Sequence, residues 1–411
     1  QRELANVKNG QPWAAGSKRK LRAAVAAITG LPLRGANRFA RYQRVVDVRH
    51  PSGATLKSFE LNIDFEETEK DGLGVSEVEA EGNVLIEGKF EEEVFAVRGE
   101  KAIYSLSSAL IRIPDRPRIE SGANRLSGQT ASINLEDPRK PALALDGEVR
   151  MEAVSPAPVD ANAKKPKPDI RTVILAESFR YGQVAENVVF ERSVVVTRSD
   201  GVTLKSEWLN AQVDAESDRI GRIEAKRNVI VEMKGENGTA VAKSGGAVID
   251  EATGLVVLRK EDGKQPEIVQ GENLLRGDEI ELDFRNLEDL RMKAKGNTRL
   301  KAAQLGEDST TPVELAADKF SYGGKILLAE GNAQLAFAMP SRTADKPAVP
   351  MKAWGQSIIV DQKLGVATLD TAVRVVDAGG IEINCKHLIV DIPETEGEAL
   401  KLSDLTATGD V

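Results

Sequence analysis

The stretch Ala54-Thr55-Leu56-Lys57-Ser58 returns later in the chain as Val202-Thr203-Leu204-Lys205-Ser206. The two copies align without a gap at an offset of 148 residues, from 54 to 202. The match extends upstream as far as Arg44 in the first copy and Arg192 in the second. A weaker copy, with the same valine-rich strand and glycine turn, runs from residue 373 to residue 383. Repeats of this size predict an array in which each unit completes the core of its neighbour.

Most of the sequence around these copies reads as short β-strands. In residues 59–66 the apolar side chains fall on one parity and the charged or polar ones on the other, which is the period of a half-buried strand. The segments 229–233 and 279–284 repeat this pattern, whereas helix periodicity is hard to find after residue 30. We therefore expect an all-β fold, preceded by a short helix in the alanine-rich residues 21–30.

A Gly-Asn pair recurs just before a strand, at Gly82-Asn83, Gly296-Asn297 and Gly331-Asn332. Degenerate copies occur at residues 226–229 and 408–411. Both residue types tolerate positive φ, so the pair lets a strand bulge or turn at a defined point. Its recurrence indicates strand register rather than chemistry.

Two aromatic residues spaced two apart occur in Phe179-Arg180-Tyr181 and again in Phe320-Ser321-Tyr322. Residues at this spacing share one face of a strand. Packing in the core or at the end of a sheet is favoured over ligand stacking for these rings.

These phrases outline three β modules. The expected organisation is a basic and alanine-rich segment (1–30), module 1 (31–153), a proline-rich linker or loop (154–170), module 2 (171–303) and module 3 (313–411). Proline removes ladder donors and favours extended, solvated backbone, which is why the proline-rich residues are assigned to loops. The non-Met start and the strand-like end indicate that module 3 is truncated and that the chain is cut from something longer.

Composition excludes several classes of protein. Apolar residues make up 41% of the chain, which argues against disorder, but aromatic residues only 4%. The net charge of -8 and the pI near 5.3 argue against nucleic-acid binding, since the dense basic cluster at 18–22 is a single short run. Cys385 is the only cysteine, so no disulfide framework or thiol metal site is expected.

No apolar run approaches the ~20 residues needed to span a bilayer.

No catalytic constellation emerges, and no cofactor or metal is implied. His50 and His387 are the only histidines, which nearly excludes a histidine-based triad or a multi-histidine metal site. Carboxylates such as Glu281 and Asp283 could suggest glycoside hydrolysis, but same-parity acids on a strand usually form its solvated face. We expect a protein without enzymatic activity.

The repeated motifs resemble the OstA-like family, the fold of the periplasmic lipopolysaccharide-transport proteins LptA and LptC. The resemblance rests on Ala80-Glu-Gly-Asn-Val-Leu-Ile86, on strands of the type 274–283, and on alanine-containing strands such as 242–250. It covers most of residues 35–411, and its strength lies in the recurrence of short motifs.

The resemblance implies tandem β-jellyroll modules, open like a folded sheet and stacked edge to edge into an elongated array. An apolar groove would then carry the acyl chains of lipopolysaccharide or a similar glycolipid through the periplasm, and edge strands would pair with other OstA-like proteins. The sequence differs from the family pattern in its three expected modules instead of one, and none of its segments resembles the N-terminal membrane helix of LptC-like members.

The expected groove lining consists of apolar residues from the alternating strands: Phe59, Leu61, Ile63, Phe65, Val84, Ile86, Val229, Val231, Met233, Ile280, Leu282, Phe284, Leu335 and Phe337. A closed sandwich core demands the same alternation, so the sequence does not choose between an open groove and a packed interior. A structural β-solenoid or stalk of the cell envelope, without lipid cargo, is therefore the alternative function, and a carbohydrate-active β-protein is a third.

Overall fold

The computed structural model confirms the all-β class. It describes residues 39–49, 55–68, 72–90, 93–136, 142–155, 169–182, 187–214, 219–235, 238–250, 253–283, 291–302, 313–339, 349–361, 363–364, 366–391, 405–409 and 411. The chain divides into two compact units, residues 1–191 and 192–411. The expected N-terminal helix and the whole segment 1–30 lie outside the described residues.

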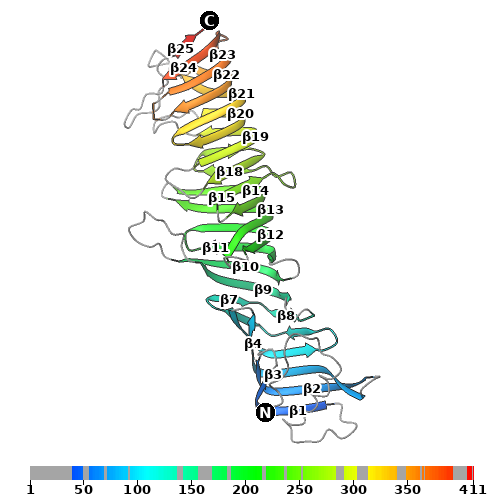
Figure 1. Cartoon of the computed structure of the whole chain (residues 1–411). Coiled ribbons are helices and arrows are strands. Elements are labelled where there is room, and N and C mark those ends of the chain that lie inside the picture. Colours follow the sequence, from blue (N-terminus) through cyan, green and yellow to red (C-terminus); the bar gives the residue numbers. More distant parts are fainter. Residues whose placement is uncertain are drawn as a thin grey trace. The chain divides into compact units, whose positions relative to one another are not determined.

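Unit 1 is a ladder of antiparallel strands in which the first four strands and the last two pair in the order of the chain. Figure 1 labels most of its strands. The strands of unit 1 are β1 (Phe39–Arg49), β2 (Thr55–Thr68), β3 (Gly72–Phe90), β4 (Glu93–Ser105), β5 (Leu110–Ile113), β6 (Arg118–Ser121), β7 (Asn124–Ser127), β8 (Thr130–Asn134), β9 (Ala142–Ser155) and β10 (Ile170–Tyr181).

Strand β11 (Asn187–Arg198) contains the point at which the chain divides, and unit 2 continues with a second antiparallel ladder. Its strands are β12 (Val202–Asp214), β13 (Arg219–Gly235), β14 (Gly238–Asp250), β15 (Leu255–Arg259), β16 (Glu267–Gln270), β17 (Asn273–Arg276), β18 (Glu279–Asp283), β19 (Arg291–Ala302), β20 (Val313–Gly323), β21 (Ile326–Met339), β22 (Val349–Asp361), β23 (Val366–Asp377), β24 (Glu382–Asp391) and β25 (Leu405–Thr408).

Broken strands occur in both units at matching places. In unit 1, β5 and β6 both pair with β4, while β7 and β8 both pair with β9. In unit 2, β15 and β16 both pair with β14, and β17 and β18 both pair with β19. β7 begins at residue 124 and β17 at residue 273, an offset of 149 that is close to the sequence offset. The repeat architecture is therefore confirmed, whereas the three module boundaries stay a prediction.

The long strands change register partway along their length, at a point that we call the corner, and the β2–β3 and β12–β13 pairs have a second shift nearer the strand ends. The shift falls between Glu81 and Val84 where β3 pairs with β4, and between Glu330 and Ala333 where β21 pairs with β22. The Gly-Asn pairs occupy these corners with positive φ, 75° and 50° at Gly82-Asn83 and 76° and 48° at Gly331-Asn332. The predicted bulge is thereby confirmed.

Corners of two kinds alternate along each ladder. Strands β3, β9, β13, β19, β21 and β23 carry two successive residues with positive φ at the corner. The described residues of their neighbours β2, β4, β10, β12, β20 and β22 carry no such pair. Glycine is not obligatory, because Arg227-Asn228 and Thr371-Ala372 adopt the same left-handed conformation.

Candidate functional site

The most extended feature of unit 2 is an unbroken row of apolar side chains across its strands on one side of the corners. Each residue lies directly opposite the next in the ladder. All are buried, with relative exposures of 0–5%. Ten steps of about 4.8 Å make the row roughly 50 Å long. We call it column A, and it comprises Leu209, Ala225, Ala247, Leu258, Ile280, Ala294, Phe320, Ala329, Ile358, Leu369 and Leu388.

A second row, column B, crosses the same unit on the other side of the corners. Most of its members are buried, and Ile268, Leu300 and Ile383 are half-buried. The described part of unit 2 contains only strands and turns, so we infer that the two arms of each bent strand enclose an apolar interior. Column B comprises Leu204, Val231, Ala242, Ile268, Leu275, Leu300, Leu315, Leu335, Ala353, Val375 and Ile383.

Unit 1 carries an equivalent row, column C, that is less completely shielded. Val97, Leu126 and Ile174 are 2%, 9% and 5% exposed, but the other five members are only half-buried. The interior of unit 1 is therefore more accessible along this arm than columns A and B are in unit 2. Column C comprises Val48, Leu56, Ile86, Val97, Ile119, Leu126, Met151 and Ile174.

The structure buries most of the residues expected to line a groove. Leu61, Ile63, Phe65, Val84, Val229, Val231, Ile280, Leu282, Leu335 and Phe337 are all 0–7% exposed. Ile86 and Met233 are half-buried. Phe284 lies outside the described residues. Burial on one apolar face is common to a groove and a packed core, so the lining of a groove stays a prediction.

Phe59 departs from the expected face, because its side chain is 58% exposed. The register between β2 and β3 shifts between Lys57 and Glu60, so the parity that faces the interior changes there. Ser58 lies within the shift and Leu61 follows it, and both are buried. Phe59 instead covers the corner glycine of β3, where an added Cβ at Gly82 would lie 2.9 Å from the Phe59 Cβ.

Small hydroxyl residues are buried at the corners, and the sequence reasoning missed them. The Ser58 hydroxyl donates to the Glu60 carbonyl oxygen at 2.9 Å, and the Ser244 hydroxyl donates to the Gly246 carbonyl oxygen at the same distance. Ser206, which matches Ser58 in the repeated stretch, is also buried. The signal was present, because serine is the last residue of both copies. At the first two corners the hydroxyl donates to a backbone carbonyl, whereas the buried Ser206 Oγ has no hydrogen-bond partner among the described residues.

The outer faces of the strands carry ion pairs. Glu279 lies 2.8 Å from the Lys295 ammonium, and Glu281 lies 3.5 Å from that of Lys293. Hydrogen bonding to the Arg41 guanidinium lowers the pKa of Glu60. His387 is exposed and contacts Asp370. Among the described residues, no cluster of three or more His, Cys, Asp or Glu side chains is placed to hold a metal ion.

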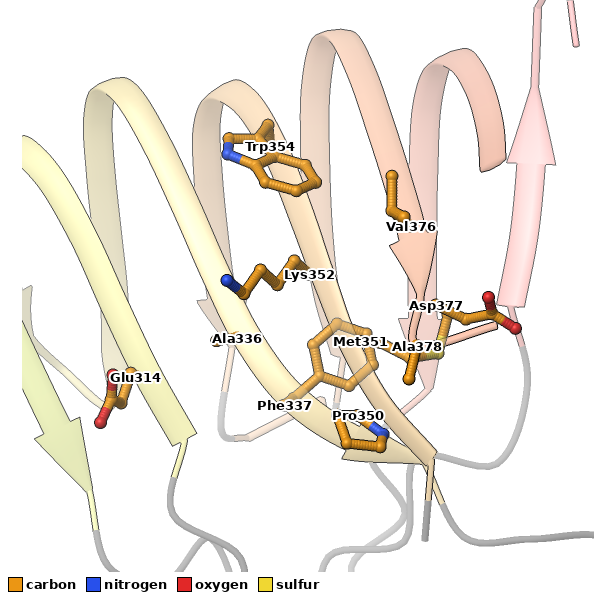
Figure 2. Close-up of a pocket in the computed structure, with 10 residues that line it drawn as sticks. All are labelled: Glu314, Ala336, Phe337, Pro350, Met351, Lys352, Trp354, Val376, Asp377 and Ala378. Atoms are coloured by element: carbon orange, nitrogen blue, oxygen red, sulfur yellow. The ribbon is translucent and has the colours of Figure 1, made fainter. Parts of the chain in front are cut away.

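A pocket of about 380 Å³ lies in unit 2 over β20 to β23 and the residue that follows β23 (Figure 2). Seven of its ten lining residues are apolar, and no sequence motif marks this pocket. The lining comprises Glu314, Ala336, Phe337, Pro350, Met351, Lys352, Trp354, Val376, Asp377 and Ala378.

Comparisons with known proteins give no family assignment. No protein-family model matches the sequence, and a search of curated proteins finds no significant relative. In the part of the chain that the structure describes, no helix has the length and apolarity to cross a membrane.

Proposed function

We propose that the protein is a non-enzymatic carrier of lipid acyl chains, acting as a bridge of the OstA type in the periplasm of a Gram-negative-type envelope. Lipopolysaccharide, or a similar glycolipid, is the proposed cargo. The observation that carries the proposal is the continuity of the apolar columns, which run from strand to strand without a polar interruption. Pairing of edge strands with other OstA-like proteins completes the proposed bridge.

The columns have the apolar character that the transport of an acyl chain requires. A buried methylene gains about 0.8 kcal/mol relative to water, so a chain needs an apolar track along its whole length. An acyl chain fills about half of a ~30 Å hydrocarbon core, or roughly 15 Å, which is much shorter than the roughly 50 Å of column A. Because the column repeats similar aliphatic side chains, a chain would meet nearly the same environment at successive strands, which permits movement along them.

Column C is the proposed place of entry. Its half-buried members, such as Ile86, Ile119 and Met151, leave apolar surface accessible along one arm of unit 1. Exposed apolar surface of this kind commonly marks a binding surface.

Site-specific photo-crosslinking in cells tests the proposal. A crosslinker at Ile86 or Met151 faces the interior, whereas one at Leu85 or Arg150 lies on the opposite parity of the same strands and serves as a matched control. We expect lipopolysaccharide adducts from the two inner positions and none from the outer ones. Absence of lipid adducts at both inner positions, in protein that is folded and expressed, would refute the assignment.

A structural stalk is the second candidate, and the complete burial of column A favours it. Ile280, Ile358 and Leu388 are 0% exposed, as in a packed core that leaves no room for a ligand. A stalk predicts that purified protein carries no lipid detectable by native mass spectrometry. It also predicts that crosslinkers at Ile280 and Leu282 capture only the protein's own residues.

A further inference from the structure

The pocket over β20 to β23 contains a lysine whose directly paired neighbours on the outer face are apolar. Lys352 lies directly opposite Ala336 on β21 and Val376 on β23. Pro350 and Trp354, two residues away on the same strand, share its face. Figure 2 shows all five of these residues around one hollow.

No acidic partner neutralises Lys352 among the described residues. Its ammonium takes part in no ion pair there, although its side chain is exposed and its strand is well paired. The small Ala336 separates it from Glu314, which lies two strands away, or roughly 10 Å across the ladder. Lys352 is therefore a single available cation at an apolar hollow.

The other charged groups near the pocket are less suited to bind an anion. The Arg374 guanidinium donates two hydrogen bonds of 3.0 Å to Glu382 and lies over the Trp354 ring at 5.5 Å. An Asp377 carboxylate oxygen accepts the Ile381 backbone N–H at 2.7 Å and so holds the turn after β23. Glu314 and Asp377 would also repel additional negative charge on a ligand.

We propose that this pocket binds a single-chain amphiphile with one negative charge, its carboxylate on Lys352 and its alkyl chain against Trp354, Val376 and Pro350. A volume of about 380 Å³ is within the range of small-molecule sites and holds about a dozen water-sized groups. A polyanionic head group fits poorly because of Glu314 and Asp377. The pocket shares no lining residue with columns A and B, although Phe337 belongs to the expected groove lining, and the inference goes beyond the proposed acyl-chain carrier.

Calorimetric titration of the full chain with dodecanoate, below the concentration at which it forms micelles, tests the site. We expect saturable binding of one molecule to the pocket and no comparable binding of dodecyltrimethylammonium, which carries the opposite charge. Lys352→Met removes the cation and should weaken dodecanoate binding at least about tenfold. Ala336→Leu fills the hollow without changing charge and should weaken it as well.

Lys363→Met is the matched control, because Lys363 is also exposed in unit 2 but lies outside the pocket. It should bind dodecanoate as the unchanged protein does, and all three variants should keep the unfolding midpoint. Equal binding by Lys352→Met, equal binding of the cationic amphiphile, or no saturable binding would each overturn the proposal. Lys352-dependent binding of phosphatidylglycerol vesicles without binding of dodecanoate would overturn the choice of a single-chain ligand. Crosslinking from Ile86 reports on the interior independently.

Discussion

Replacing the corner glycine of β21 tests how the folded strands are held. Gly331 has φ of +76°, and a Cβ added there would lie 2.4 Å from the Asp318 Oδ2 and 2.9 Å from the Asp318 Cβ. Asp318 lies in this place because its Oδ2 accepts a hydrogen bond of 3.0 Å from the Asn332 side chain. Gly331→Ala therefore adds backbone strain and also displaces the carboxylate that binds its neighbour.

The two contributions can be estimated separately. Left-handed φ costs a residue with a Cβ about 1–2 kcal/mol. Loss of an exposed hydrogen bond and the forced shift of Asp318 add about 1 kcal/mol. We expect Gly331→Ala to lower the free energy of local opening by about 2–3 kcal/mol, which corresponds to amide exchange roughly 30- to 150-fold faster near the corner.

Gly324→Ala is the matched control on the neighbouring turn. Gly324 has φ of +60°, but an added Cβ would meet no atom within 4 Å. Only the cost of the left-handed backbone conformation therefore remains in this variant. Hydrogen exchange measured by mass spectrometry on peptides from residues 313–339 compares the two variants. Equal acceleration in both would refute the reasoning, because it would mean that Asp318 has no part in the requirement for glycine at 331.

Three further perturbations test other parts of the fold. Ile280→Ala, at a 0% exposed position of column A, should lower the free energy of unfolding by about 2–5 kcal/mol in urea titration, whereas Glu281→Ala on the outer face should change it by under about 0.5 kcal/mol. Hydrogen bonding to Arg41 lowers the pKa of Glu60, so this carboxylate stabilises the fold above its unfolded-state pKa and loses that contribution as pH falls through its folded-state pKa. The difference in unfolding free energy between the unchanged protein and Glu60→Gln should therefore shrink on acidification. A difference that is independent of pH would count against this role of Glu60. Burial raises the pKa of the Cys385 thiol, so a thiol reagent at neutral pH should label the native protein at least about tenfold more slowly than the urea-unfolded chain, and equal rates would show that the side chain is accessible.

Local patterns predicted the strands and the corners that carry a Gly-Asn pair. Alternation of apolar and polar residues is a property of one strand, so Ile280 and Leu282 could be assigned to one face from sequence. The Gly-Asn pairs were equally readable, because both residue types favour positive φ. Corners formed by Thr371-Ala372 carry no such signal and became visible only in the structure.

Features that depend on the partner strand could not be read from the sequence. Phe59 was assigned to the wrong face because the register shift in β2 lies opposite the Gly-Asn pair of β3, and β2 itself has no glycine at that point. The pocket depends on the register of β20 to β23, which places Ala336 and Val376 beside Lys352 although they are distant in sequence. Neither neighbour is marked by a local motif.

The alternation of two corner types constrains how such a chain can change in length. Neighbouring strands are antiparallel, so within each unit the strands with a left-handed pair at the corner run in one direction and the strands without such a pair run in the other. Gain or loss of one strand would reverse the direction of every strand beyond it. Corners with a left-handed pair would then lie where the ladder needs a corner without one. The ladder can therefore grow or shrink in evolution only by hairpins of two strands, and designed variants should be shortened by the same increment.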